Sequence, residues 1–157
     1  EKQYGFVAGH IPFHFLKDFP ENTFAFTFLR NPVDQVISLY NYAKRNSSHY
    51  LNKYTGNGLE YFVKNDQITE NDNVQTRFLF LYKDAYPQLD KNLDDITKIR
   101  NGECTNELLE QAKFNLSQLQ WIGIQELFDE SLFFLFDKLK FGLPIYNYSF
   151  NINKSNQ

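Results

Sequence analysis

The chain has 157 residues, of which 42% are hydrophobic and 22% charged, and its formal net charge is -3. This length suits one domain with a real core, and an aromatic content of 18% rules out a disordered chain. The acidic balance disfavours a nucleic-acid binder, which needs basic residues to neutralise phosphates. Cys104 is the single cysteine, which excludes an intrachain disulfide framework and a zinc site built from cysteines. No apolar run approaches the roughly 20 residues that span a bilayer.

The N-terminal part of the chain predicts two strands and a helix. The apolar run Tyr4–His10 predicts a buried strand with a turn behind it, and Thr23–Leu29, rich in aromatic and β-branched residues, predicts another strand. Asn31 can cap a helix and Pro32 suits its first turn, so we expect a helix that runs to about Lys44. Strand, tight turn and helix form half of a βαβ unit.

The rest of the chain predicts a loop over 46–55, a weakly patterned segment over Leu89–Arg100, a third strand over Gln120–Gln125 and a polar tail over Asn147–Gln157. Four further helices are expected: Gly58–Lys64, Asp72–Tyr82 capped by Asp72 or Asn73, Thr105–Asn115 capped by Thr105, and Phe128–Lys140 stopped by Gly142. Strands separated by helices predict an α/β fold with a mainly parallel sheet. Ligands bind such sheets beyond the carboxyl ends of the strands, where His10 and Arg30 are expected.

Several familiar catalytic motifs are absent from the sequence. It contains no G-x-x-x-x-G-K-[ST], no G-x-G-x-x-G, no G-x-S-x-G, and no His/Asp/Glu cluster with metal-ligand spacing. A self-contained hydrolase or a Rossmann dehydrogenase is therefore poorly supported. A P-loop kinase would share the sheet architecture, but no metal-binding Asp at a strand end supports it.

The most informative stretch runs from Phe28 to Tyr40. Arg30 at the strand end and Ser38 two turns into the helix can converge on one anion, since Arg offers a planar charged fork and the helix start adds its dipole. This chemistry suits a phosphate monoester. On spacing alone a second interpretation stays open, in which Arg30 pairs with Asp34 and Ser38 is merely exposed.

The spacing R-x-P-x-x-x-x-x-S from Arg30 to Ser38 resembles the 3′-phosphate-binding motif of the sulfotransferases. The chain resembles most the carbohydrate branch that includes heparan sulfate 2-O-sulfotransferase and its bacterial relatives. Four other stretches resemble that branch in the right order: Ala8–Pro12, Asp72–Leu79, Trp121–Leu132 and Asn153–Ser155. The resemblance covers the chain from about residue 4 to residue 155.

This resemblance implies a three-layer, P-loop-NTPase-like fold, in which helices flank a mainly parallel sheet, as a single domain over residues 1–157. The family's first strand and its Pro-Lys-Thr/Ser loop, which carries a catalytic lysine, precede the Gly-His element and would lie before Glu1. The sequence also contains no methionine, so we expect an N-terminally incomplete fragment. The implied reaction transfers a sulfuryl group from 3′-phosphoadenosine 5′-phosphosulfate to a hydroxyl, with a carbohydrate as the favoured acceptor and no metal.

The resemblance also implies roles for particular residues. The expected site comprises His10 as the general base, Arg30, Ser38, Lys154 and Ser155 for the nucleotide, and Gln75 and Arg77 for the substrate. Each has a structural alternative: a lone His is commonly a satisfied structural residue, and Gln75 with Arg77 can form a polar helix face. Glu126 is expected to interact with the dipole of its own helix.

A second function stays open, namely a non-catalytic sulfotransferase-like protein that binds a nucleotide, or a carbohydrate through exposed Tyr and Phe side chains. A Lys-Thr/Ser loop upstream of Glu1 would distinguish the enzyme from this alternative. The lone cysteine and the Asn/Lys-rich composition favour a bacterial cytoplasmic protein, with the Golgi lumen as the alternative for a eukaryotic one.

Overall fold

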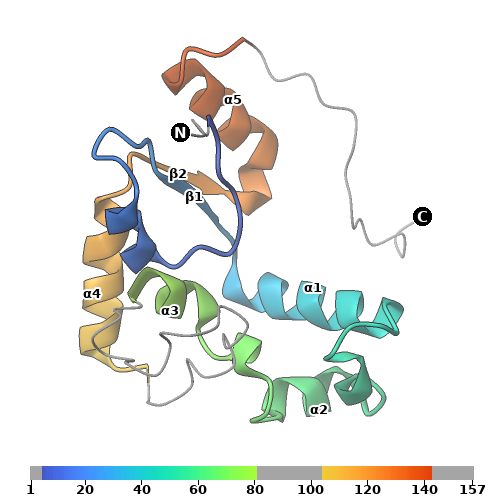
Figure 1. Ribbon diagram of the computed structural model, residues 1–157. Helices are drawn as coiled ribbons and strands as arrows, with labels where there is room; N and C mark the ends of the chain where they lie inside the picture. Colours follow the sequence, from blue (N-terminus) through green and yellow to red (C-terminus); the bar gives the residue numbers. More distant parts are fainter. Residues whose placement is uncertain (1–4, 81–103, 143–157) are drawn as a thin grey trace. The chain divides into compact units, whose positions relative to one another are not determined.

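The computed structural model describes residues 5–80 and 104–142 (Figure 1). Some expectations concern positions outside these residues: Leu89–Arg100, Asn147–Gln157, Lys154 and Ser155. Within the described part the chain forms five α-helices, several short 3-10 helices and a two-stranded parallel sheet, which confirms the α/β class. None of the helices there is long and apolar enough to cross a membrane.

The described residues form two compact units, and each unit combines segments that are distant in the sequence. The first unit combines residues 5–25 with 73–80 and 104–120. The second unit combines residues 26–72 with 121–142.

The second unit contains the sheet. Strand β1 (Phe26–Leu29) pairs in parallel with β2 (Trp121–Ile124), and the register runs from Phe26 opposite Trp121 to Leu29 opposite Ile124. Both strands lie inside the ranges predicted from the sequence, Thr23–Leu29 and Gln120–Gln125. The parallel pairing was also expected, because a helix rather than a tight hairpin follows β1.

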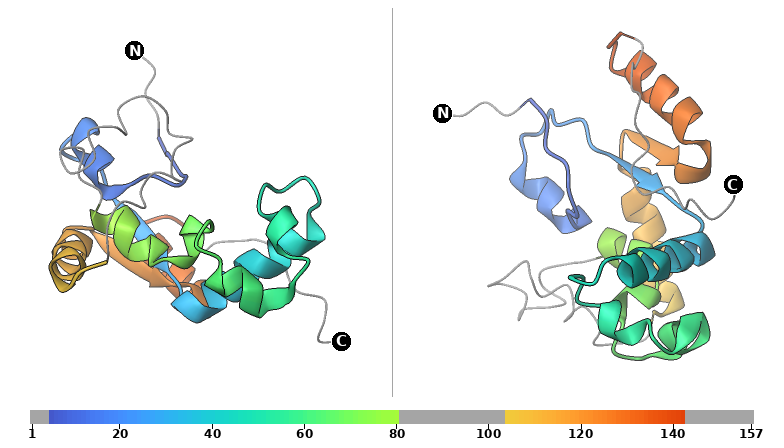
Figure 2. Two further views of the ribbon diagram at one scale, coloured as in Figure 1. Left: turned by 90° about the horizontal axis from the view of Figure 1, so that it is seen from below. Right: turned by 90° about the vertical axis from the view of Figure 1, so that its right-hand side faces the viewer.

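Helix α1 (Pro32–Arg45) follows β1 after a two-residue turn, as predicted. The Asn31 side chain caps the helix by accepting the Val33 N–H at 2.9 Å, and Pro32 occupies the first turn, where an N–H would lack a helical partner. Helix α2 (Gly58–Lys64) has the predicted bounds. It lies beside α1 in both views of Figure 2.

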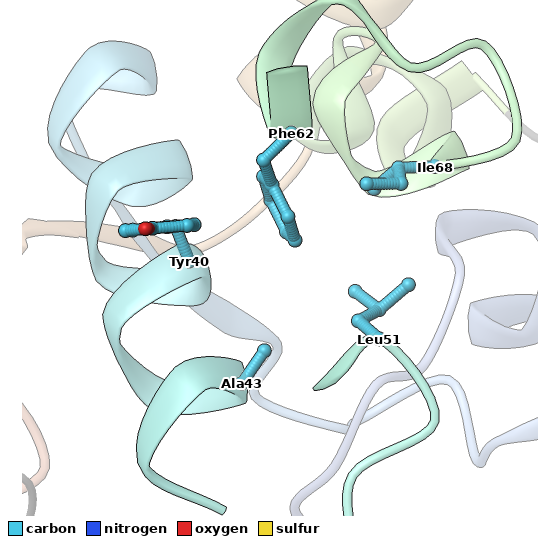
Figure 3. Packing of buried hydrophobic residues seen from close by; sticks show 5 residues of the cluster. All are labelled: Tyr40, Ala43, Leu51, Phe62 and Ile68. Atoms are coloured by element: carbon cyan, nitrogen blue, oxygen red, sulfur yellow. The ribbon is translucent and has the colours of Figure 1, made fainter. Parts of the chain in front are cut away.

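A hydrophobic cluster joins α1 and α2 to the segment between them and to Ile68, which follows α2. In the segment between the helices, the predicted loop contains turns and the 3-10 helix η2 (Asn52–Tyr54). The ring of Tyr40 meets that of Phe62 edge-on, with centroids 5.3 Å apart. Figure 3 shows the five buried members of the cluster directed towards one another: Tyr40, Ala43, Leu51, Phe62 and Ile68.

Helix α5 (Phe128–Lys138) completes the second unit after the 3-10 helix η7 (Gln125–Leu127). It ends before the predicted Lys140, because Lys140 itself adopts a left-handed conformation with φ 57°. The backbone N–H of Phe141 then bonds to the carbonyl of Phe136 at 2.9 Å. The left-handed residue that stops the helix is therefore Lys140, two residues before Gly142, the residue that the sequence indicated.

The first unit is helical. It contains the 3-10 helix η1 (Phe13–Asp18), α3 (Val74–Phe80) and α4 (Asn106–Ser117), with η1 and α4 both packed against α3. Helix α3 begins two residues later than the predicted Asp72. The Asn115 amide on α4 donates to the carbonyl of Leu79 at 2.8 Å, which ties the two helices together.

The start of α4 confirms its predicted cap. The Thr105 side chain accepts the Leu108 N–H at 3.2 Å. Leu108 and Ala112 on this helix are buried, whereas Leu109 is 38% exposed and does not share their buried face.

The predicted buried strand over Tyr4–His10 is wrong throughout its described part, residues 5–10. This segment is irregular and exposed, with Phe6 at 70% and Val7 at 50% exposure. A strand needs a neighbouring strand for its backbone groups, and the only ladder in the described residues joins β1 to β2. His10 therefore does not follow a strand end.

Candidate functional site

The candidate site lies in the second unit, where β1 and β2 end. The last paired residues are Leu29 and Ile124, so Asn31 and Glu126 each occupy the second position beyond that pair. A carboxylate oxygen of Glu126 accepts the Asn31 N–H at 2.9 Å. The Glu126 side chain thus links the two chain segments directly beyond the end of the β1–β2 pairing, where η7 follows β2.

The setting of Glu126 lowers the pKa of its carboxyl below the ordinary value. The largest cause is the hydrogen bond from the Asn31 N–H, followed by one from its own N–H, and the positive charge of Arg30 adds to both. Desolvation acts in the opposite direction and is outweighed. The carboxyl of Glu126 is therefore ionised at neutral pH, because the backbone N–H groups and the charge of Arg30 all favour its charged form.

Arg30 occupies the position that the sequence predicted, directly after β1 and before α1. Its side chain is half-buried, as is that of Ser38 on α1. Ser38 lies six residues after Pro32, the first residue of the helix, and so in its second turn. The structure thus places Arg30 between β1 and α1, and Ser38 in the second turn of α1, within the same unit.

The backbone of the first turn of α1 leaves few N–H groups for a ligand. Pro32 has no N–H, the Val33 N–H goes to the Asn31 side chain, and the Gln35 N–H goes to the Asn31 carbonyl at 2.9 Å. An anion at this end of the helix would therefore be held mainly by side chains and by the helix dipole.

The structure adds a long-range partner to Glu126. The expected interaction with the dipole of its own helix stays a prediction, and the carboxylate accepts the N–H of Asn31, the residue that caps α1. The partnership joins residues 95 positions apart, so no local pattern could reveal it. Its one available signal was topological: residues just beyond the ends of neighbouring parallel strands meet at the same sheet edge.

Three other predicted site residues, His10, Gln75 and Arg77, lie in the described residues and belong to the first unit. His10 is exposed, and its ring lies 6.1 Å from that of Phe78 on α3, measured between centroids. On the same helix Gln75 is half-buried and Arg77 is only 4% exposed. The structure therefore brings His10 to the helix that carries Gln75 and Arg77, while their roles in catalysis and substrate binding stay predictions.

Residues 5–80 and 104–142 contain no group of three or more His, Cys, Asp or Glu side chains that could hold a metal ion. Comparisons with protein-family models, with curated proteins and with solved structures find no match to this chain.

Proposed function

We propose that this chain belongs to a sulfotransferase of the carbohydrate branch. It would transfer a sulfuryl group from 3′-phosphoadenosine 5′-phosphosulfate to a hydroxyl, with a carbohydrate as the favoured acceptor. The observation that carries the proposal is the position of Arg30 at the carboxyl end of a parallel strand, followed at once by the helix that bears Ser38. This is the edge at which open α/β sheets bind ligands.

The chemistry of the two side chains fits a phosphate monoester. The Arg30 guanidinium offers a planar set of donors to two phosphate oxygens, and the Ser38 hydroxyl adds a neutral donor. We assign both to the 3′-phosphate of the nucleotide, which is remote from the reacting sulfur. A nucleotide without the 3′-phosphate cannot make this contact with the half-buried Arg30. Its affinity is therefore lower, and this difference in affinity gives selectivity.

In the transfer step, the acceptor oxygen attacks sulfur while its proton passes to a base, and the bond from sulfur to the phosphate oxygen breaks. His10 is the proposed base, because a neutral imidazole nitrogen can accept a proton and its exposed ring is open to an acceptor. Negative charge then develops on the leaving nucleotide, 3′-phosphoadenosine 5′-phosphate, and requires preorganised positive charge.

Calorimetric titration of the chain with 3′-phosphoadenosine 5′-phosphate and with adenosine 5′-phosphate tests the proposal. We expect the first to bind more tightly. Arg30→Ala should weaken its binding by about 1.5–3 kcal/mol, the range for a hydrogen bond to a charged group, and leave the second ligand nearly unaffected.

Arg45→Ala is the matched control, because Arg45 is an exposed arginine at the opposite end of α1. Equal affinity of the wild-type chain for the two nucleotides would refute the proposed function. Tight binding without any sulfuryl transfer, in a protein that also carries the upstream Lys-Thr/Ser loop, would point to the non-catalytic alternative.

A further inference from the structure

Glu126 fixes the peptide group that joins Arg30 to Asn31. A peptide unit is planar, so its N–H, its carbonyl and both flanking Cα atoms move together. The Asn31 N–H belongs to this unit and is held by the Glu126 carboxylate at 2.9 Å. The Asn31 carbonyl belongs to the next peptide unit and is held by the Gln35 N–H at 2.9 Å. The peptide unit that follows the Arg30 Cα is thereby fastened to Glu126, beyond the end of β2, and the next unit is fastened to α1.

A side chain is needed for this contact because the ladder has ended. Beyond Ile124 the backbone of β2 turns into the 3-10 helix η7 and no longer runs alongside β1. The glutamate side chain has the length to reach across this divergence. A carboxylate also makes a stronger bond to a backbone N–H than a neutral acceptor does.

The negative charge of Glu126 opposes phosphate binding. The carboxylate orients the backbone through its hydrogen bond, but its charge also repels a phosphate that approaches Arg30. Glu126 is exposed, so water and salt screen this repulsion, whereas the hydrogen bond to Asn31 acts at contact distance. We therefore expect the hydrogen bond to Asn31 to affect phosphate binding more than the charge repulsion does.

We propose that Glu126 is a positioning residue, which sets the selectivity of Arg30 for a 3′-phosphate by holding the Arg30–Asn31 peptide at the end of the sheet. The proposal rests on the proposed function, since it presumes that Arg30 binds that phosphate. Glu126 itself need not touch the nucleotide.

Three substitutions in the full chain separate reach from charge. Glu126→Gln keeps the reach and an acceptor oxygen but removes the charge. Glu126→Asp keeps the charge but is one methylene shorter, and Glu126→Ala removes both. The readout is the ratio of affinities for 3′-phosphoadenosine 5′-phosphate and adenosine 5′-phosphate, a ratio that a general loss of stability would not alter.

We expect the ratio to fall about tenfold in Glu126→Ala and Glu126→Asp, which corresponds to the loss of one hydrogen bond, and to stay within about threefold of wild type in Glu126→Gln. Glu130→Ala, which removes an exposed carboxylate from the first turn of α5, is the control and should change nothing.

The opposite ranking, with Asp like wild type and Gln altered, would overturn the proposal in favour of a charge effect. An unchanged ratio in both Asp and Ala would overturn it too. Should the Ala variant not fold, the comparison of Gln with Asp decides alone. A wild-type chain with no preference for the 3′-phosphate refutes the proposed function itself, which is a distinct outcome.

Discussion

Ser131 on α5 shows how a single side chain can secure a strand end. It is 8% exposed, and its hydroxyl both accepts the Ile124 N–H at 3.0 Å and donates to the Ile124 carbonyl at 3.2 Å. Ile124 is the last residue of β2, so the serine satisfies both backbone groups where the strand stops. The hydroxyl therefore links α5 directly to the sheet.

Ser131→Ala should lower the free energy of unfolding by about 1–2 kcal/mol, because it leaves two backbone groups in a part-buried setting without this partner. Urea unfolding monitored by circular dichroism measures the change. Ser117→Ala is the control, since the exposed Ser117 hydroxyl bonds only to neighbours in sequence: it donates to the Phe114 carbonyl and accepts from the Gln118 side chain. An equal loss of unfolding free energy in the two variants would contradict the role assigned to the Ser131 hydroxyl.

The caps and the long-range contacts differ in how well the sequence predicts them. Asn31 and Thr105 cap helices through N–H groups two and three residues away, and both were predicted from short-range rules. The partners of Glu126 and Ser131 depend on which strands and helices are neighbours. Residue type and spacing do not encode that information, so these two roles emerged only from the structure.

The end of α5 illustrates the same limit for a whole element. Lys140 adopts a left-handed conformation, its N–H bonds to the Asp137 carbonyl at 3.1 Å, and the Phe141 N–H bonds to the Phe136 carbonyl. The Phe136 and Phe141 rings also meet edge-on, with centroids 5.8 Å apart. These contacts form a Schellman motif, in which the apolar pair fixes the stop and glycine would be the usual residue at position 140.

Lys140→Gly should raise the free energy of unfolding by about 0.5–1 kcal/mol, because glycine adopts this conformation without the steric cost of a side chain. The lost contact from Lys140 to Asp137, at 3.8 Å between exposed groups, is a weak one. Lys138→Gly, two residues earlier and still helical, should instead destabilise by about 1 kcal/mol. Thermal unfolding of both variants distinguishes the opposite signs.

The predictions for Gly142 and for Tyr4–His10 were wrong for the same reason: each relied on a local pattern, whereas the outcome depended on contacts that the pattern does not contain. A glycine after an apolar helix is a common stop signal, yet the pairing of Phe136 with Phe141 placed the stop earlier. The apolar run before His10 fits a strand locally, but a strand forms only where a neighbour accepts its hydrogen bonds. By contrast, β1, α1 and β2 carry signals within their own residues, and all three were predicted.

At the level of the whole chain, the β1–β2 ladder joins the two distant segments of the second unit. Phe28 faces Gly123 across this ladder, and its ring packs near Trp121 and Phe128, with centroids 5.6 Å and 5.2 Å away. A methyl group on Gly123 would lie 2.6 Å from carbons of the Phe28 ring and closer still to the Trp121 ring. The ladder therefore depends on a residue without a side chain at this position.

Gly123→Ala should destabilise the protein by about 1–3 kcal/mol, the usual cost of overpacking, because two rings would have to move. Gly56→Ala is the matched control: nothing lies within 4 Å of the added carbon, so stability should stay nearly unchanged. Hydrogen exchange of the β1 amides gives a local readout. Unaltered protection of those amides in Gly123→Ala would contradict this account of the ladder.

The register also sets an order of events during synthesis. Phe26 pairs with Trp121, so β1 leaves the ribosome 95 residues before its partner. At about 5–20 residues per second, the nascent strand waits for about 5–20 s. The adjacent helices α1 and α2 make sequence-local contacts and can form in that interval. We therefore expect the surroundings of Arg30, which require β2 and Glu126, to assemble after α1 and α2.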